Sequence, residues 1–88
     1  MDAKQLALVT ARHDHPRVKA KLSWEDYLYR CIADNTLSFN ECVELAHLHG
    51  LSAQVQAEIE IRLYERAGAK GAVERATERY NRLFAQGG

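Results

Sequence analysis

Apolar residues recur at helical spacing along most of the chain, and this pattern predicts an all-α fold. Trp24, Tyr27, Leu28, Cys31 and Ile32 fall at i, i+3, i+4, i+7 and i+8, which places them on one face of a helix. Similar stripes follow at Phe39, Cys42, Val43 and Ala46, at Val55, Ile59 and Leu63, and at Val73, Ala76, Tyr80, Leu83 and Phe84. We expect a compact bundle of four main helices with a short N-terminal helix, over residues 3–12, 23–34, 38–49, 52–67 and 72–85.

Polar residues and a glycine at the expected helix ends support these boundaries. Ser38 and Glu41 have the spacing of a capping box, in which each side chain accepts a hydrogen bond from the other residue's backbone N–H. Ser23 precedes two acids, as is typical of a helix start. Gly50 and Ser52 form a stop and a start in quick succession, because glycine readily takes the left-handed conformation that ends helices. The two central helices should therefore meet at a tight turn.

The beginning of the chain is predicted to be a basic arm outside the main bundle. Its short helix should end before Pro16, because proline pushes the preceding residue out of the helical conformation. Residues 17–22 would then form a basic connector, either a loop or a loose extra turn. The expected domain organisation is an N-terminal basic arm with a short helix at 1–22 and a helical domain at 23–88.

Charge is divided unevenly along the 88 residues, although the formal net charge is zero. Residues 1–21 carry a net charge of +3, residues 22–60 carry −6 and residues 61–88 carry +3. Such a split favours a charged partner or contacts between copies of the chain. No apolar run reaches the ~18 residues of a membrane helix, and the first residues lack a signal-peptide core. We therefore expect a cytoplasmic location and no membrane partner.

No group of residues in the sequence has the spacing of a metal or catalytic site. His47 and His49 would point about 200° apart on a helix, whereas structural zinc sites need four ligands in recognisable pairs. Cys31 and Cys42 fall on apolar helical faces and should be buried free thiols. The link around Lys70 lacks the Ser or Thr of a phosphate-binding loop. We predict a protein that is not an enzyme and that needs no cofactor and no metal.

The leading hypothesis is a small non-catalytic regulator or inhibitor that docks on another protein. It rests on the segregated charge and on the aromatic residues, which exceed what so small a core needs and should be partly exposed as binding anchors. The candidate protein-binding residues are Glu41, Glu44, Glu58, Trp24 and Tyr64. The three glutamates among them suit a partner that is basic or associated with nucleic acid. The size and the Ala/Arg-rich composition suit an accessory protein of a bacterium, a phage or a plasmid.

The alternative hypothesis is a DNA-binding transcriptional regulator. Ala46 and Gly50 stand four apart and precede Leu51-Ser52, and this stretch of about ten residues resembles the centre of many helix-turn-helix motifs, which here would use residues 38–66. The second helix departs from that pattern, because Gln56 takes a usually apolar position and several acids would oppose phosphate. The candidate nucleic-acid-binding residues are Arg62, Arg66, Arg75, Arg79 and Arg82. A third hypothesis is a structural homodimer without a separate partner.

Overall fold

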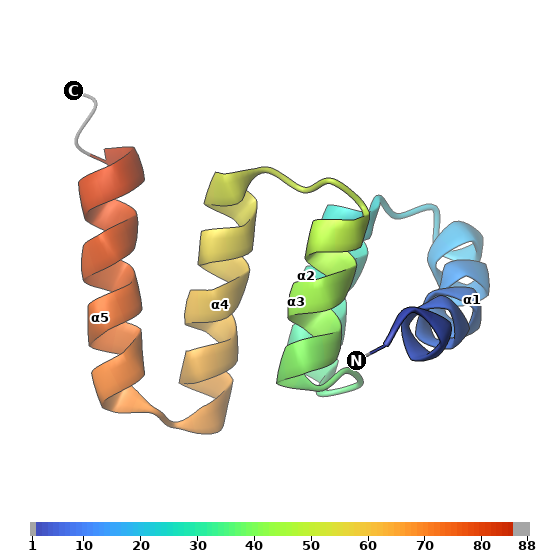
Figure 1. Ribbon diagram of the computed structural model, residues 1–88, viewed down its shortest axis with the longest axis horizontal. Helices are drawn as coiled ribbons and strands as arrows, with labels where there is room; N and C mark the ends of the chain where they lie inside the picture. Colours follow the sequence, from blue (N-terminus) through green and yellow to red (C-terminus); the bar gives the residue numbers. More distant parts are fainter. Residues whose placement is uncertain (1, 86–88) are drawn as a thin grey trace.

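Five α-helices and a terminal π-helical turn build the fold in the computed structural model, which describes residues 2–85 (Figure 1). The elements are α1 (Ala3–Lys19), α2 (Trp24–Asp34), α3 (Phe39–Leu48), α4 (Ala53–Ala67), α5 (Lys70–Tyr80) and the π-helical segment Asn81–Ala85, which continues α5. Figure 1 shows α3, α4 and α5 in a row, with α2 behind α3 and α1 at the opposite end of the row from α5. The predicted all-α bundle with its additional N-terminal helix is confirmed. None of the described helices is long and apolar enough to cross a membrane.

Three serines begin helices at the positions that the sequence predicts. The hydroxyls of Ser23, Ser38 and Ser52 each accept a hydrogen bond, 3.2 Å long, from the backbone N–H three residues ahead. At Ser38 the capping box is complete, because the Glu41 carboxylate accepts the Ser38 backbone N–H at 2.9 Å. Gly50 follows α3 with a φ of +67°, a conformation that strains residues with a Cβ. The predicted tight turn between the central helices is therefore confirmed.

The N-terminal helix is longer than predicted, because α1 continues through Pro16 to Lys19. The prediction that the helix ends before Pro16 is wrong, and of residues 17–22 only 20–22 form the connector. Pro16 lies in the last turn, where its ring removes only the hydrogen bond that its N–H would give to the Arg12 carbonyl. Its own carbonyl still accepts the N–H of Ala20 at 3.0 Å, so the final turn closes.

The side chain of Arg17 holds this last turn in place. Its guanidinium donates to the Asp14 carboxylate at 2.8 Å and to the Leu22 carbonyl at 3.0 Å. The same guanidinium lies 4.8 Å from the centre of the Trp24 ring. Lys21 then takes the left-handed conformation, with a φ of 58°, and the chain turns into α2. Arg17 thus contacts Leu22 and Trp24, which lie outside the helix. Hydrophobic spacing within residues 17–22 does not reveal such contacts and therefore does not predict the longer helix.

One buried core joins α1 to α2, α3 and α4. Its members are Val9, Tyr27, Leu28, Cys31, Ile32, Leu37, Cys42, Leu45, Ala46, Ile59 and Leu63. Both cysteines are buried, as predicted. Val9 brings α1 into the same core as the helices of the predicted 23–88 domain. The outermost residues of the two predicted ranges, 1 and 86–88, lie outside the described residues.

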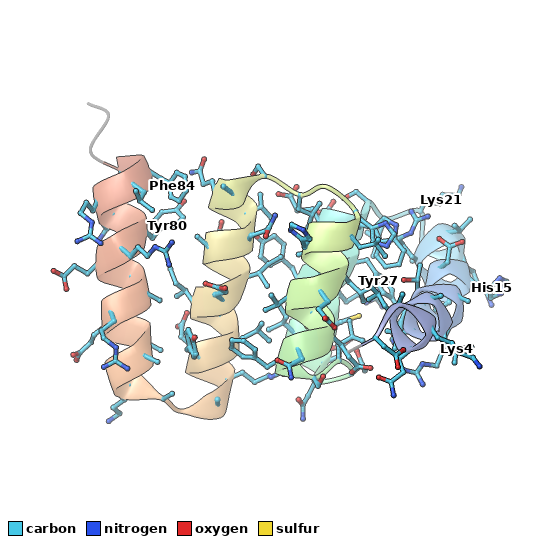
Figure 2. All side chains as sticks on the ribbon, in the orientation of Figure 1. Lys4, His15, Lys21, Tyr27, Tyr80 and Phe84 are labelled. Carbon is cyan, nitrogen blue, oxygen red and sulfur yellow. The ribbon has the colours of Figure 1, made fainter. Side chains whose placement is uncertain are left out.

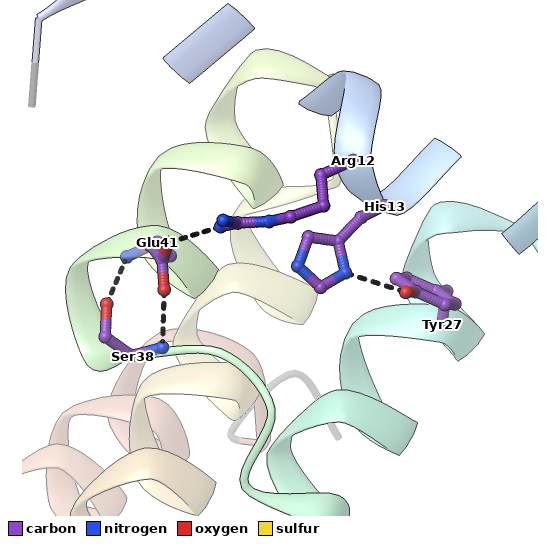
Figure 3. A network of polar contacts seen from close by, with 5 residues as sticks. All are labelled: Arg12, His13, Tyr27, Ser38 and Glu41. Carbon is purple, nitrogen blue, oxygen red and sulfur yellow. Dashed lines mark hydrogen bonds and ion pairs between the residues drawn. The ribbon is translucent and has the colours of Figure 1, made fainter. Parts of the chain in front are cut away.

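Two polar contacts fasten α1 to its neighbours (Figure 3). The Arg12 guanidinium lies 3.4 Å from the Glu41 carboxylate of α3, and His13 Nδ1 lies 2.8 Å from the Tyr27 hydroxyl of α2. Burial lowers the pKa of His13, and burial also raises the pKa of Tyr27 to about 12. Both partners of the second contact are therefore mainly neutral at pH 7, so it is an ordinary hydrogen bond between uncharged groups.

The last helix adds nothing to the buried core. None of the residues of α5 or of its described π-helical continuation is buried. It packs along α4, and Figure 1 shows it at the outer edge of the row. It begins at Lys70, two residues before the predicted start. The apolar side chains of this helix therefore lie at a surface rather than inside the core.

Candidate protein-docking groove

Glu41 and Glu44, two of the predicted docking acids, are both half-buried on α3. The Glu41 carboxylate completes the capping box and faces Arg12, whose side chain is 66% exposed. The backbone N–H of Ser38 lowers the pKa of the Glu41 carboxyl, and Arg12 adds to this effect. Reversing the charge at Glu41 would therefore disturb the start of α3, whether or not a partner binds there.

Three predicted site residues lie on α4 near other helices: Glu58, Arg62 and Arg66. The Arg62 guanidinium lies 3.4 Å from the Glu58 carboxylate and 4.7 Å from the centre of the Tyr29 ring of α2. Burial, together with the Glu58 carboxylate, raises the pKa of Tyr29 to about 12. Arg66 is half-buried near Cys42 of α3, where its charge opposes the rise in thiol pKa that burial causes. Of the predicted phosphate-binding arginines, Arg62 thus contacts a neighbouring helix, and Arg66 lies close to another.

Trp24 and Tyr64 pack against other rings. Trp24 stacks on His49 with ring centres 3.9 Å apart, and the Tyr27 ring meets it edge-on at 5.8 Å. Tyr64 packs on Phe39 with ring centres 5.1 Å apart. Both residues remain half-buried, so each keeps some exposed surface. Of the two, Tyr64 also borders a hollow on the described surface.

This hollow is a groove of about 610 Å³ between α4 and α5. Its lining is mixed. Alanine, leucine and aromatic side chains (Ala53, Ala57, Tyr64, Ala72, Ala76, Tyr80, Leu83 and Phe84) lie beside polar ones (His47, Gln56, Glu60, Arg75 and Arg79). His47 reaches it from α3. Alanine side chains are short, so they leave empty space between α4 and α5 where these two helices pack together. Its volume falls in the range of about 300–1,000 Å³ that is common for binding clefts.

Two aromatic side chains of the last helix and its continuation, Tyr80 and Phe84, are part of the groove lining. Figure 2 shows Tyr80 and Phe84 projecting from α5 and its continuation towards α4. Their ring centres are 5.3 Å apart, and the Tyr80 hydroxyl accepts a hydrogen bond from the Gln54 amide at 2.9 Å. Tyr80 therefore lies over the start of α4. In a helix-turn-helix protein this part of the second helix enters the DNA groove.

Charged side chains line both walls of the groove without pairing across it. Arg75 and Arg79 come from α5, and Glu60 comes from α4. Within residues 2–85, neither these three side chains nor Arg82 takes part in an ion pair or a hydrogen bond. Other arginines of the chain do have carboxylate partners, namely Arg12, Arg17, Arg30 and Arg62. The groove thus carries charges that the described fold leaves unused.

The sequence pattern names several residues of the groove but does not predict the groove itself. Arg75, Arg79 and Tyr64 were among the predicted site residues. Leu83 was assigned to the apolar face of the last helix, yet its side chain is 57% exposed. The signal that the sequence does contain is alanine at i and i+4 in two helices, at residues 53 and 57 and at residues 72 and 76. That signal has meaning only once these two helices are known to be neighbours.

Neither a metal centre nor a known relative offers another starting point. Within residues 2–85, no group of three or more His, Cys, Asp or Glu side chains is placed to hold a metal ion. No family model, curated protein or solved structure matches the chain. The geometry and the charges of the groove are therefore the observations that bear on function.

Proposed function

We propose that this protein is a small non-catalytic regulator or inhibitor that acts in the cytoplasm by docking on another protein through the α4–α5 groove. One observation supports this proposal above the others. Tyr80, Leu83 and Phe84 of the last helix and its continuation line the groove. Beside them, Arg75 and Arg79 take part in no ion pair or hydrogen bond within residues 2–85. Apolar surface next to unpaired arginine is typical of protein-binding sites, in which aromatic residues and arginine are enriched.

The location of the titratable groups with shifted pKa values supports a non-catalytic role. Such groups tend to gather at active sites, because catalysis needs them. Here the described examples are His13, Tyr27, Tyr29, Glu41, Cys42 and His49. They lie at contacts within and between α1, α2, α3 and α4, and none of them lines the groove. Burial and helix capping account for their shifts without a reaction.

A photo-crosslinking amino acid in place of Leu83 tests the docking proposal in cells that make the protein. Leu83 is 57% exposed and lines the groove, whereas Val18 is 55% exposed on α1 and serves as the matched control. We expect one discrete adduct from position 83 and none from position 18. Filling the groove with Ala57→Trp should remove that adduct while circular dichroism shows an intact fold. Equal adducts from both positions, or none from position 83, would refute the proposal.

The helix-turn-helix alternative predicts a different result. Its support is the row of arginines on the last helix, which have no ion pair or hydrogen bond among the described residues and could contact phosphates. The position of Tyr80 over the start of α4 counts against it. Fluorescence anisotropy with labelled duplex DNA at ~50 and ~200 mM salt separates the two proposals. Tight binding that weakens steeply with salt, and that Arg62→Glu with Arg66→Glu abolishes, would replace docking by DNA binding.

A further inference from the structure

We infer that the α4–α5 groove receives an amphipathic helix of the partner that carries carboxylates along one edge. This inference rests on the proposed docking function and gives the chemistry of its partner. Three properties of the groove support it: its shape between two helices, the apolar part of its lining and the arrangement of its charges.

The shape of the groove suits a helix better than an extended peptide. Two neighbouring helices form its walls, and α4 alone has 15 residues, which corresponds to about 22 Å at 1.5 Å per residue. An extended peptide satisfies its backbone by adding to the edge of a sheet, and residues 2–85 form no strand that could offer such an edge. A helix satisfies its backbone internally and can lie in the hollow over two others, as in helical bundles.

The lining provides room for large apolar side chains of the partner. Ala57 and Ala76 are half-buried and lie on opposite walls, so the side chains that a partner inserts meet short methyl groups there. Leu83 and Phe84 offer larger apolar surface near one end. Apolar partner residues at i, i+4 and i+7 would follow the same helical spacing as the lining and could contact it in succession.

The charges fix which edge of the partner helix is acidic. Arg75 and Arg79 stand one turn apart on the α5 wall, so their guanidinium groups match two carboxylates at i and i+4. Arginine can bind a carboxylate with two parallel hydrogen bonds, which makes it a selective partner. Glu60 on the α4 wall would repel a second acidic edge. The partner helix therefore turns its carboxylates towards α5 and its neutral or basic edge towards α4.

Two stapled helical peptides of about 15 residues test this inference on the full chain. Both carry Leu at i, i+4 and i+7; one has a pair of Glu residues on one flank, and the other has Lys at the same two positions. We expect fluorescence anisotropy to show that the Glu peptide binds at least about tenfold more tightly than the Lys peptide, with the difference shrinking as salt rises. Amide shifts in the ¹⁵N spectrum should map the Glu peptide to the groove.

Charge reversal in the protein provides the sharper control. The double variant Arg75→Glu with Arg79→Glu should reverse the preference, so that the Lys peptide binds more tightly. Arg82 is also exposed and has no ion pair or hydrogen bond in the described part of the chain, but it does not line the groove, so Arg82→Glu should leave the preference unchanged. Equal binding of the two peptides, or an unaltered preference in the double variant, overturns the inference.

The remaining outcomes separate this inference from the proposed function. If neither peptide binds while position 83 still forms its adduct, docking stands and the inferred helix is wrong. If the adduct is also missing, both proposals fail. If sedimentation shows a dimer that Ala57→Trp disrupts, a second copy of the chain occupies the groove, and that result also overturns the inference.

Discussion

Replacing Glu41 with alanine would measure how much this carboxylate contributes to the stability of the fold, apart from the docking role predicted for it. In the folded protein it accepts the Ser38 backbone N–H at 2.9 Å and faces Arg12 at 3.4 Å. The first contact is a hydrogen bond to a charged acceptor at a partly exposed helix end, which contributes about 1 kcal/mol. The second contributes at most about 0.5 kcal/mol, because the Arg12 side chain is 66% exposed and solvent screens the pair.

The expected cost of Glu41→Ala is therefore about 1–1.5 kcal/mol, which lowers Tm by roughly 5–10 °C in a domain of this size. Thermal and urea unfolding at pH 7, followed by circular dichroism, measures it. Glu41→Gln is the matched control, because its amide oxygen can still accept the Ser38 N–H while the charge is lost. It should cost only about 0.5 kcal/mol, the part assigned to Arg12.

The pH dependence of the same variant gives a second check. The folded pKa of Glu41 is lowered, chiefly by the Ser38 N–H, below the value of about 4.3 expected in the unfolded chain. The stabilisation is therefore fully present above that pH and disappears as the pH falls through the folded pKa. The charge-dependent part of the difference between wild type and Glu41→Ala should vanish in acid. A cost below about 0.3 kcal/mol at pH 7 would refute the capping argument.

Four further predictions concern the core, the histidines, one turn and the last helix. Leu45→Ala should cost about 2–5 kcal/mol in urea unfolding, because this side chain is 0% exposed; a loss below 1 kcal/mol would mean a looser core. Burial lowers the pKa of His13 and His49, so stability should fall as the pH drops below about 6.5, and replacing both with glutamine should flatten urea midpoints between pH 7.5 and 5.5. Lys21→Gly should raise Tm slightly, because a φ of 58° strains lysine; a lower Tm would show that glycine's greater flexibility outweighs this strain. Amide hydrogen exchange should be faster in α5 than in α3, because α5 has no buried residue, and equal protection would contradict its peripheral role.

Local signals in the sequence predict most of the fold. Ser23, Ser38 and Ser52 each begin a helix as expected, because an N-cap depends on a side chain and on a backbone N–H three residues away. Pro16 is the exception. Its local preference against helix is outweighed by Arg17, whose contacts with Leu22 and Trp24 reach outside the helix. Spacing within a segment cannot reveal such contacts.

The groove is harder to predict because it exists only where side chains of α5 stay out of the buried core. The sequence places Tyr80 and Leu83 on one apolar face of the last helix. In the structure it leaves Leu83 exposed and Tyr80 half-buried beside α4. The spacing of charged residues likewise does not reveal which of them form ion pairs. Glu78 and Arg82 have the spacing of an ion pair, yet Arg82 has no ion pair or hydrogen bond within residues 2–85.

The stacking of Trp24 on His49 gives the protein an internal optical probe of one region. Trp24 is the single tryptophan of the chain, so its emission reports the junction of α1, α2 and α3. An imidazole in stacking contact quenches indole fluorescence more strongly when it is protonated, so the emission should dim as acid charges His49. Figure 1 places α4 between this junction and α5. Melting of α5 alone would therefore reduce the far-ultraviolet helical signal and leave the tryptophan emission unchanged.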